Sequence, residues 1–146
     1  MIQEKRKEFI AQIMKYALVG SLNTGIDFAV LNLLLWMTGI YSGKWIILLN
    51  AIAFSVAVIN SYFWNKFWTF KDKGTDGSKV KEFSQFVSIT LIGMILNTAV
   101  VYFMTTFTSP IMELSPELWA NLAKVFATGI SLVWNFLGYK FIIFKK

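Results

Sequence analysis

The stretch Tyr16–Ile40, YALVGSLNTGIDFAVLNLLLWMTGI, decides the fold class of this chain. It contains one charged residue, Asp27, and it has the length that a helix needs to cross the hydrocarbon of a bilayer, about 17–25 residues. Three more apolar stretches of similar length follow, at Trp45–Phe63, Phe86–Phe107 and Leu118–Ile143. The sequence therefore predicts an all-α membrane protein with four transmembrane helices.

The composition supports this fold class and excludes several kinds of chemistry. Of 146 residues, 56% are hydrophobic and 15% are charged, whereas soluble domains average about 45–50% and about 25%. The mean hydropathy is +0.58. The sequence has neither cysteine nor histidine, which removes disulfides, zinc sites and catalytic triads. We expect no catalytic residue, no metal site and no cofactor, and hence a protein that is not an enzyme.

The distribution of Lys and Arg predicts the topology. Twelve of the 14 basic residues precede the first span, separate the second from the third, or lie at or beyond the C-terminal end of the fourth. The two other loops contain only Lys44, so both termini are expected in the cytoplasm. Because the net charge of +6 lies at membrane edges, no nucleic-acid partner is expected. Residues 1–15 are charged and amphipathic and predict a short interfacial helix, and residues 16–146 predict a single four-helix transmembrane domain.

The two halves of the chain resemble each other at a shift of 74 residues. Asn23-Thr24 corresponds to Asn97-Thr98, and Lys66-Phe67 corresponds to Lys140-Phe141. Two spans per unit return the chain to the same side, which predicts two parallel two-helix repeats. The alternative is that membrane helices resemble each other by composition. Small residues at helical spacing predict helix contacts at Gly25 and Ala29, at Ala53 and Ala57, and at Ala123, Ala127 and Ser131.

Two ionisable residues lie inside predicted spans and are candidates for function. Asp27 lies in the first span, and Lys124 lies in the fourth within a polar stripe at helical spacing: Asn121, Lys124, Thr128, Ser131 and Asn135. Their counterparts in the other half are Val101 and Asn50, so each half lacks the charge that the other half has. The predicted boundaries place Lys124 roughly 9 Å nearer the outer face than Asp27, which leaves their contact open. Alternatives are that Lys124 snorkels to the headgroups and that Asp27 serves structural pairing.

A second group of residues lies at the cytoplasmic ends of the second and fourth spans. Lys66 follows Asn60 and Asn65, and Lys140 follows Asn135. Lysine at headgroup level beside amide and aromatic side chains can bind a lipid phosphate, although cytoplasmic helix ends commonly look like this.

These motifs resemble the GtrA-like family. The resemblance rests on Val19-Gly20 with Asn23-Thr24 and an acid in the first span, on Asn60 to Phe70 as Asn-x-x-x-x-Asn-Lys-x-Trp-Thr-Phe, and on Asn135-Phe136 with a terminal aromatic-basic run. It covers about Tyr16–Lys145. It implies a small four-span protein of a bacterial or archaeal cytoplasmic membrane, associated with cell-surface polysaccharide synthesis. Lys66 replaces an arginine that is frequent in the family, and Tyr139 replaces an expected asparagine.

From the residues and this resemblance, we expect a flippase for a polyprenyl-phosphate-linked sugar that serves polysaccharide or teichoic acid glycosylation. The sugar headgroup and membrane lipid are the expected partners. The expected substrate-binding residues line a polar groove and its cytoplasmic mouth: Asn23, Asp27, Asn60, Asn65, Lys66, Asn97, Asn121, Lys124, Asn135 and Lys140. Alternatives are a scaffold that recruits a membrane glycosyltransferase and a proton-coupled four-span multidrug exporter. A homodimer or larger homo-oligomer is expected, because four helices make a thin wall around a large headgroup.

Overall fold

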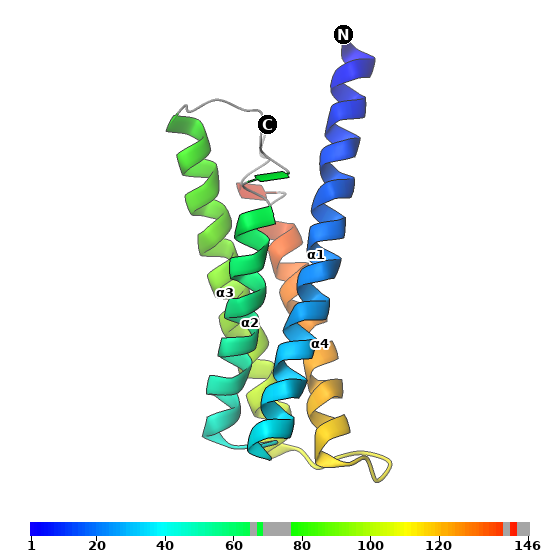
Figure 1. The fold of residues 1–146 in the computed structure, drawn as a ribbon, viewed down its shortest axis with the longest axis vertical. Helices are drawn as coiled ribbons and strands as arrows, with labels where there is room; N and C mark the ends of the chain where they lie inside the picture. The colour runs from blue at the N-terminus through cyan, green and yellow to red at the C-terminus, as the bar shows by residue number, and fades with distance from the viewer. Residues whose placement is uncertain (65–66, 69–76, 139–140, 143–146) are drawn as a thin grey trace.

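A computed structural model describes residues 1–64, 67–68, 77–138 and 141–142. The described part contains four α-helices: α1 (Ile2–Thr38), α2 (Lys44–Trp64), α3 (Gly77–Phe107) and α4 (Pro116–Gly138). They run side by side as a bundle, and α1 extends beyond it at its N-terminal end (Figure 1). The α1–α2 and α3–α4 connections lie at the opposite end, which we call the loop end; we call the end where α1 begins the terminal end.

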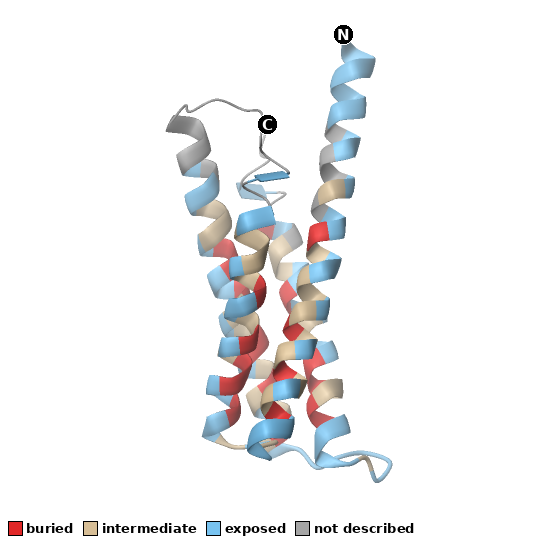
Figure 2. Cartoon of the chain, in the orientation of Figure 1, coloured by how far each residue is buried: buried red, intermediate tan, exposed pale blue. Residues whose placement is uncertain are grey.

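The first helix differs from the prediction, because residues 1–15 do not form a separate helix. α1 continues unbroken from Ile2 to Thr38. The stretch before Gly20 contains neither glycine nor proline, so nothing in the backbone interrupts the hydrogen-bond ladder where the composition changes. Most described side chains between Met1 and Met14 are exposed, in agreement with a segment outside the bundle (Figure 2).

Glycine, serine and proline define the helix ends at the loop end. Gly39 adopts a left-handed conformation with φ 65°, and its N–H donates to the Leu35 carbonyl over 2.8 Å, which closes α1. The Ser115 hydroxyl accepts from the Leu118 N–H over 3.2 Å and caps α4. Pro116 is the first residue of α4, a position that suits the fixed φ and the missing N–H of proline.

The helices pack as two tight pairs. α1 packs most extensively against α2 and α3 against α4, α2 packs less against α3, and α1 makes the smallest contact with α4. Buried residues gather on the inner faces (Figure 2). The apolar core consists of Leu31, Leu35, Ile46, Leu49, Ala53, Val101, Ala120 and Ala127. The two pairs agree with a repeated two-helix unit, and the repeat itself stays a prediction.

The small residues pack as predicted in two of three helices. Ala53 and Ala57 of α2 are buried, as are Ala123, Ala127 and Ser131 of α4. The expectation for α1 was wrong, since Gly25 and Ala29 are exposed and a methyl group added at Gly25 would meet no atom within 4 Å. The buried face of α1 instead contains Asp27, Leu31 and Leu35, which leaves Gly25 and Ala29 on its outer side.

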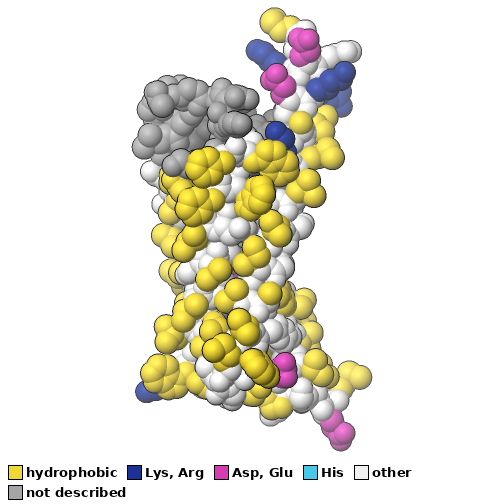
Figure 3. All heavy atoms as spheres, viewed as in Figure 1, with side chains coloured by type: hydrophobic (Ala, Val, Ile, Leu, Met, Phe, Trp, Pro, Cys, Tyr) yellow, Lys and Arg dark blue, Asp and Glu magenta, His cyan; other side chains and the backbone are white. Residues whose placement is uncertain are grey.

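Within the part of the chain that the structure describes, three segments are long and apolar enough to cross a membrane: Ala17–Thr38, Lys44–Trp64 and Phe83–Phe107. Apolar side chains cover the visible face of the bundle, while charged side chains gather on the N-terminal extension of α1 (Figure 3). α4 is not among these segments. Its polar stripe from Asn121 to Asn135 lowers its hydropathy, so a membrane crossing by α4 stays a prediction.

Candidate functional site

The two ionisable residues of the predicted spans form an ion pair inside the bundle. Lys124 Nζ lies 2.7 Å from Asp27 Oδ2. Lys124 is fully buried and Asp27 is 6% exposed. The long lysine side chain therefore reaches an acid on the neighbouring helix, although the predicted boundaries had separated the two residues along the bundle axis. Lys124 does not snorkel, because its ammonium group ends in the interior.

The Lys124 ammonium group connects all four helices. Besides Asp27 of α1, it donates to Asn50 Oδ1 of α2 over 2.8 Å and to Asn97 Oδ1 of α3 over 3.0 Å. A lysine ammonium has three N–H groups, and here each has an acceptor. A buried charge is tolerated only when it is paired and hydrogen-bonded, and this arrangement meets both conditions.

The amide groups beside this ammonium are themselves linked. Asn50 Nδ2 donates to Asn97 Oδ1 over 3.1 Å and to Thr98 Oγ1 over 2.9 Å. Asn97 Nδ2 lies 3.5 Å from its acceptor, Ser131 Oγ. The resulting central network joins Asp27, Asn50, Asn97, Thr98, Lys124 and Ser131.

Two pairs of asparagines continue the polar interior toward both ends of the bundle. Asn32 of α1 and Asn121 of α4 donate to each other's Oδ1 atoms, each over 2.7 Å, on the loop-end side of Asp27. Asn60 Nδ2 of α2 donates to Asn23 Oδ1 of α1 over 2.9 Å, on the terminal-end side. Polar contacts therefore extend along the bundle axis at three levels. In a membrane, interhelical amide contacts of this kind hold helices together.

The comparison with known proteins identifies the family. Residues 15–144 match the family described as GtrA/DPMS, transmembrane domain. The chain belongs to this family. No curated protein and no solved structure shows a significant match. Membership in the GtrA/DPMS family, together with the apolar helices, makes the chain a multi-pass membrane protein.

The structure brings together most of the residues that the sequence predicted to bind substrate. Asp27, Asn97 and Lys124 meet in the central network, whereas Asn23, Asn60 and Asn121 form the flanking amide contacts. These side chains contact each other, and the groove stays a prediction. Asn65, Lys66 and Lys140 lie outside the described residues, and their roles stay predictions as well.

Asn135 is the predicted site residue that stands apart from these contacts. It faces α3 at Gly93, where an added methyl carbon would lie 2.7 Å from Asn135 Oδ1. Asn135 Oδ1 is buried and has no hydrogen-bond partner among the described residues. Gly93 is therefore the residue that leaves room for this amide between α3 and α4.

Sequence reasoning did not include Asn32 and Asn50 among the site residues. Asn32 lies in an apolar run, and its partner Asn121 is 89 positions away. Asn50 is fully buried and accepts a hydrogen bond from Lys124. Its position as the counterpart of Lys124 in the predicted repeat was the signal that could have identified it. A lone amide inside an apolar span was the available signal, because it must find a partner on another helix.

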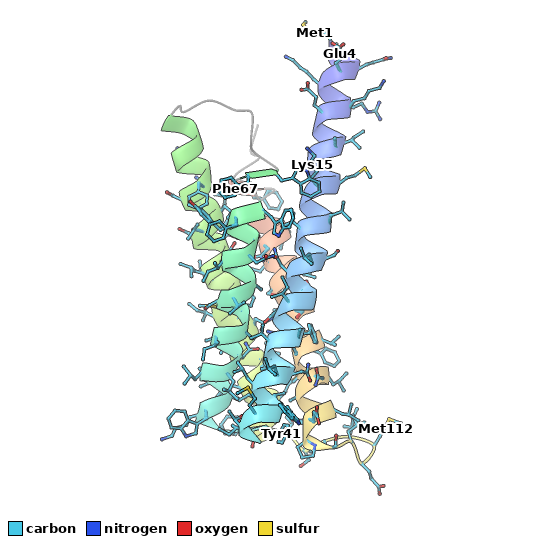
Figure 4. All side chains as sticks on the ribbon, in the orientation of Figure 1. Met1, Glu4, Lys15, Tyr41, Phe67 and Met112 are labelled. Carbon is cyan, nitrogen blue, oxygen red and sulfur yellow. The ribbon has the colours of Figure 1, made fainter. Side chains whose placement is uncertain are left out.

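The terminal end of the bundle carries an aromatic group next to a lysine. Lys15 Nζ of α1 lies 5.5 Å from the centroid of the Trp68 ring. Phe63 stacks on Phe67, and Trp64 contacts Trp68 edge to face. Figure 4 shows Lys15 and Phe67 at this end, with Tyr41 and Met112 at the other. Aromatic and basic side chains at a helix end are typical of a membrane–water interface.

Proposed function

We propose that this GtrA/DPMS protein translocates a polyprenyl-phosphate-linked sugar across a bacterial or archaeal cytoplasmic membrane. The transported sugar would serve the glycosylation of cell-surface polysaccharide or teichoic acid. One observation carries the proposal: polar contacts at three levels follow the axis of a bundle whose visible surface is apolar. A purely structural bundle needs no ionisable residue at mid-span, and such residues in membrane segments commonly mark transport pathways.

The chemistry of the interior suits a carbohydrate. Amide and carboxylate groups form hydrogen bonds with sugar hydroxyls, and the Asp27–Lys124 pair gives the centre no net charge. In the structure these groups bond to each other, which is a closed form of the proposed pathway. Interhelical hydrogen bonds in membranes average about 0.6 kcal/mol in double-mutant cycles, so sugar hydroxyls can replace the contacts between amide groups at small cost.

The proposed orientation places the terminal end in the cytoplasm. Lys66 and Lys140 would then attract the phosphate at the headgroup level, while the polyprenyl chain stays in lipid. The support is the distribution of basic residues, twelve on the proposed cytoplasmic side against Lys44 on the other.

The predicted repeat supports a single asymmetric pathway. The counterparts of Asp27 and Lys124 in the other half are Val101 and Asn50. The acid and the base therefore form a single pair in the interior that the two halves share, and the equivalent positions of the other half carry no charge.

The second candidate function is a scaffold that recruits a membrane glycosyltransferase. A closed polar interior also suits a protein that binds a partner enzyme and transports nothing. The exporter hypothesis is weaker. Proton-coupled drug export needs an acid that can exchange a proton for a cationic drug, whereas Asp27 is paired with an internal lysine.

The test is leaflet exchange in vesicles that contain only this protein. A short-chain polyprenyl phosphate that carries a fluorescent hexose is placed in both leaflets. An impermeant quencher is then added outside, and the loss of fluorescence beyond that of the outer leaflet measures the exchange. We expect exchange with the natural chain and little with Asp27→Val/Lys124→Asn, which copies the residues of the other half. Wild-type exchange that the double substitution leaves intact would refute the role of the ion pair. No exchange by the natural chain, combined with loss of glycosylation in cells lacking it, would establish the scaffold instead.

A further inference from the structure

We propose that the headgroup enters between α1 and α4 and that an uncharged sugar binds there to Asp27 Oδ1 and Thr128 Oγ1. This inference rests on the proposed function and adds an entry route and a substrate class. We call this line of contact the α1–α4 seam. Asp27 and Asn32 of α1 contact Lys124 and Asn121 of α4 across it, and Thr128 lies one helical turn after Lys124 on the same face of α4.

The seam is the weakest helix contact of the bundle. α1 and α4 have the smallest contact of the four neighbouring pairs. Two polar contacts cross the seam, Asn32–Asn121 and Asp27–Lys124. Among the side chains that the structure describes, no hydrogen bond or ion pair joins α1 to α4 on the terminal side of Asp27. There α1 is instead tied to α2 by Asn23–Asn60 and to the residues after α2 by Lys15–Trp68.

The surface of α4 beside the seam is uncovered. Val125 and Leu132 share a helix face with Thr128, three residues before it and four after it. They are 56% and 55% exposed. A polyprenyl chain can lie against this apolar surface while its headgroup enters the bundle at Thr128. By contrast, the α3-facing side of α4 is buried at Ala123 and Ala127.

Two buried oxygen atoms at the seam have no partner. Asp27 Oδ2 contacts Lys124, but Asp27 Oδ1 is buried without a hydrogen bond in the described structure, and so is Thr128 Oγ1. Thr128 follows Lys124 by one helical turn, so it shares the face of α4 that carries the lysine paired with Asp27. Buried polar atoms rarely stay unpaired, and two of them beside the smallest helix contact of the bundle point to a ligand that completes their hydrogen bonds.

The unpaired atoms determine which headgroup fits. Asp27 Oδ1 accepts a hydrogen bond, and the Thr128 hydroxyl can donate and accept. Adjacent hydroxyls of a sugar supply these partners. All three N–H groups of Lys124 already have acceptors, so Lys124 has no free N–H group to offer an anion at the seam. An anionic sugar would meet the unpaired carboxylate oxygen and be repelled, which favours an uncharged hexose over a hexuronic acid.

The first test removes one hydroxyl. Thr128→Val keeps the shape of the side chain, and Thr105→Val is the matched control, because the buried Thr105 hydroxyl already donates to the Val101 carbonyl over 2.7 Å. In the vesicle assay with the hexose lipid, Thr128→Val should lower exchange at low substrate roughly 2–10-fold, with an unchanged or raised unfolding temperature. Thr105→Val should leave exchange unchanged. Equal exchange by both variants and the natural chain would overturn the subsite.

The second test closes the seam. The chain has no cysteine, so Ser21→Cys on α1 and Leu132→Cys on α4 can be joined by a short bifunctional thiol reagent that a reductant cleaves. Cross-linking should stop exchange, reduction should restore it, and each single-cysteine variant should be insensitive. Full exchange by the cross-linked protein would overturn the entry route. If the natural chain exchanges the lipid but Thr128→Val or the cross-link has no effect, only this inference is refuted. If the natural chain does not exchange the lipid at all, the proposed function is refuted.

The third test compares substrates. We expect the natural chain to exchange the hexose lipid faster than the matching hexuronic acid lipid. Equal or reversed rates would overturn the assignment of an uncharged sugar.

Discussion

Lys124 donates a hydrogen bond of 2.8 Å to Asn50, the residue 74 positions before it and therefore its counterpart in the predicted repeat. Two equivalent residues of a two-fold arrangement can touch only near its axis. The predicted axis would thus pass between these side chains. The same contact lies in the central network with Asp27 and Asn97, so the proposed pathway and the predicted axis coincide.

The ion pair should show strong energetic coupling. Asp27→Val or Lys124→Asn alone leaves a buried charge without a partner, which is expected to destabilise the protein by about 3–5 kcal/mol. The double substitution removes both charges, so no buried charge is left without a partner. Its unfolding temperature in detergent should exceed that of either single variant. Single variants as stable as the natural chain would contradict the buried pair.

Gly93 should be required for the close approach of α3 and Asn135. Gly93→Ala places a methyl carbon 2.7 Å from Asn135 Oδ1 and should destabilise by about 1–3 kcal/mol. Gly129→Ala is the matched control, since a methyl group there meets no atom within 4 Å and alanine favours a helix. Thermal unfolding compares the two variants. Adding Asn135→Ala to Gly93→Ala should restore most of the loss, and no restoration would assign the defect to another cause.

The reciprocal amide pair should hold the loop-end part of α1 and α4 together. A double-mutant cycle of Asn32→Ala and Asn121→Ala should give a coupling energy of about 0.6–1.7 kcal/mol in unfolding experiments. Ser55→Ala provides the control with Asn32→Ala, because the exposed Ser55 hydroxyl donates to the Ala51 carbonyl of its own helix. That cycle should show no coupling. Absence of coupling between Asn32 and Asn121 would argue against their contact.

Gly39 should matter for backbone geometry alone. Its φ of 65° lies in the left-handed region, so Gly39→Ala should destabilise by about 1 kcal/mol although a methyl group would meet no atom. Gly25→Ala, in a regular helix with equal space, is expected to be neutral or stabilising. Unfolding temperatures that do not differ between these variants would contradict the left-handed helix end.

The sequence was most informative where physical chemistry acts locally. Three predicted spans agree with the structure because a run of apolar side chains is itself the property that a bilayer selects. The continuity of α1 was missed, because a change from charged to apolar residues marks a change of surroundings and leaves the backbone free to continue as a helix. A similar reason explains why α4 is not among the apolar segments. Its polar stripe faces the interior of the bundle and lowers the hydropathy of the helix.

Contacts between distant residues were harder to predict. Whether Asp27 reaches Lys124 depended on span boundaries, and an error of a few residues shifts a side chain by several ångströms. The Asn32–Asn121 contact joins residues 89 positions apart, and neither helix alone indicates its partner. The sequence therefore identified Asp27 and Lys124 as exceptional, while only the folded bundle shows that Asn50 and Asn97 share the same ammonium group.

The three acceptors of Lys124 belong to three different helices, and one nitrogen atom serves them all. Separating any one of these helices removes one acceptor from the ammonium group, and separating two at once leaves a buried cation with a single acceptor. We therefore expect the bundle to open at one helix contact at a time, while the acceptors on the other helices stay bonded to the Lys124 ammonium group. Such an interlock would let a large headgroup pass without opening a continuous leak for ions.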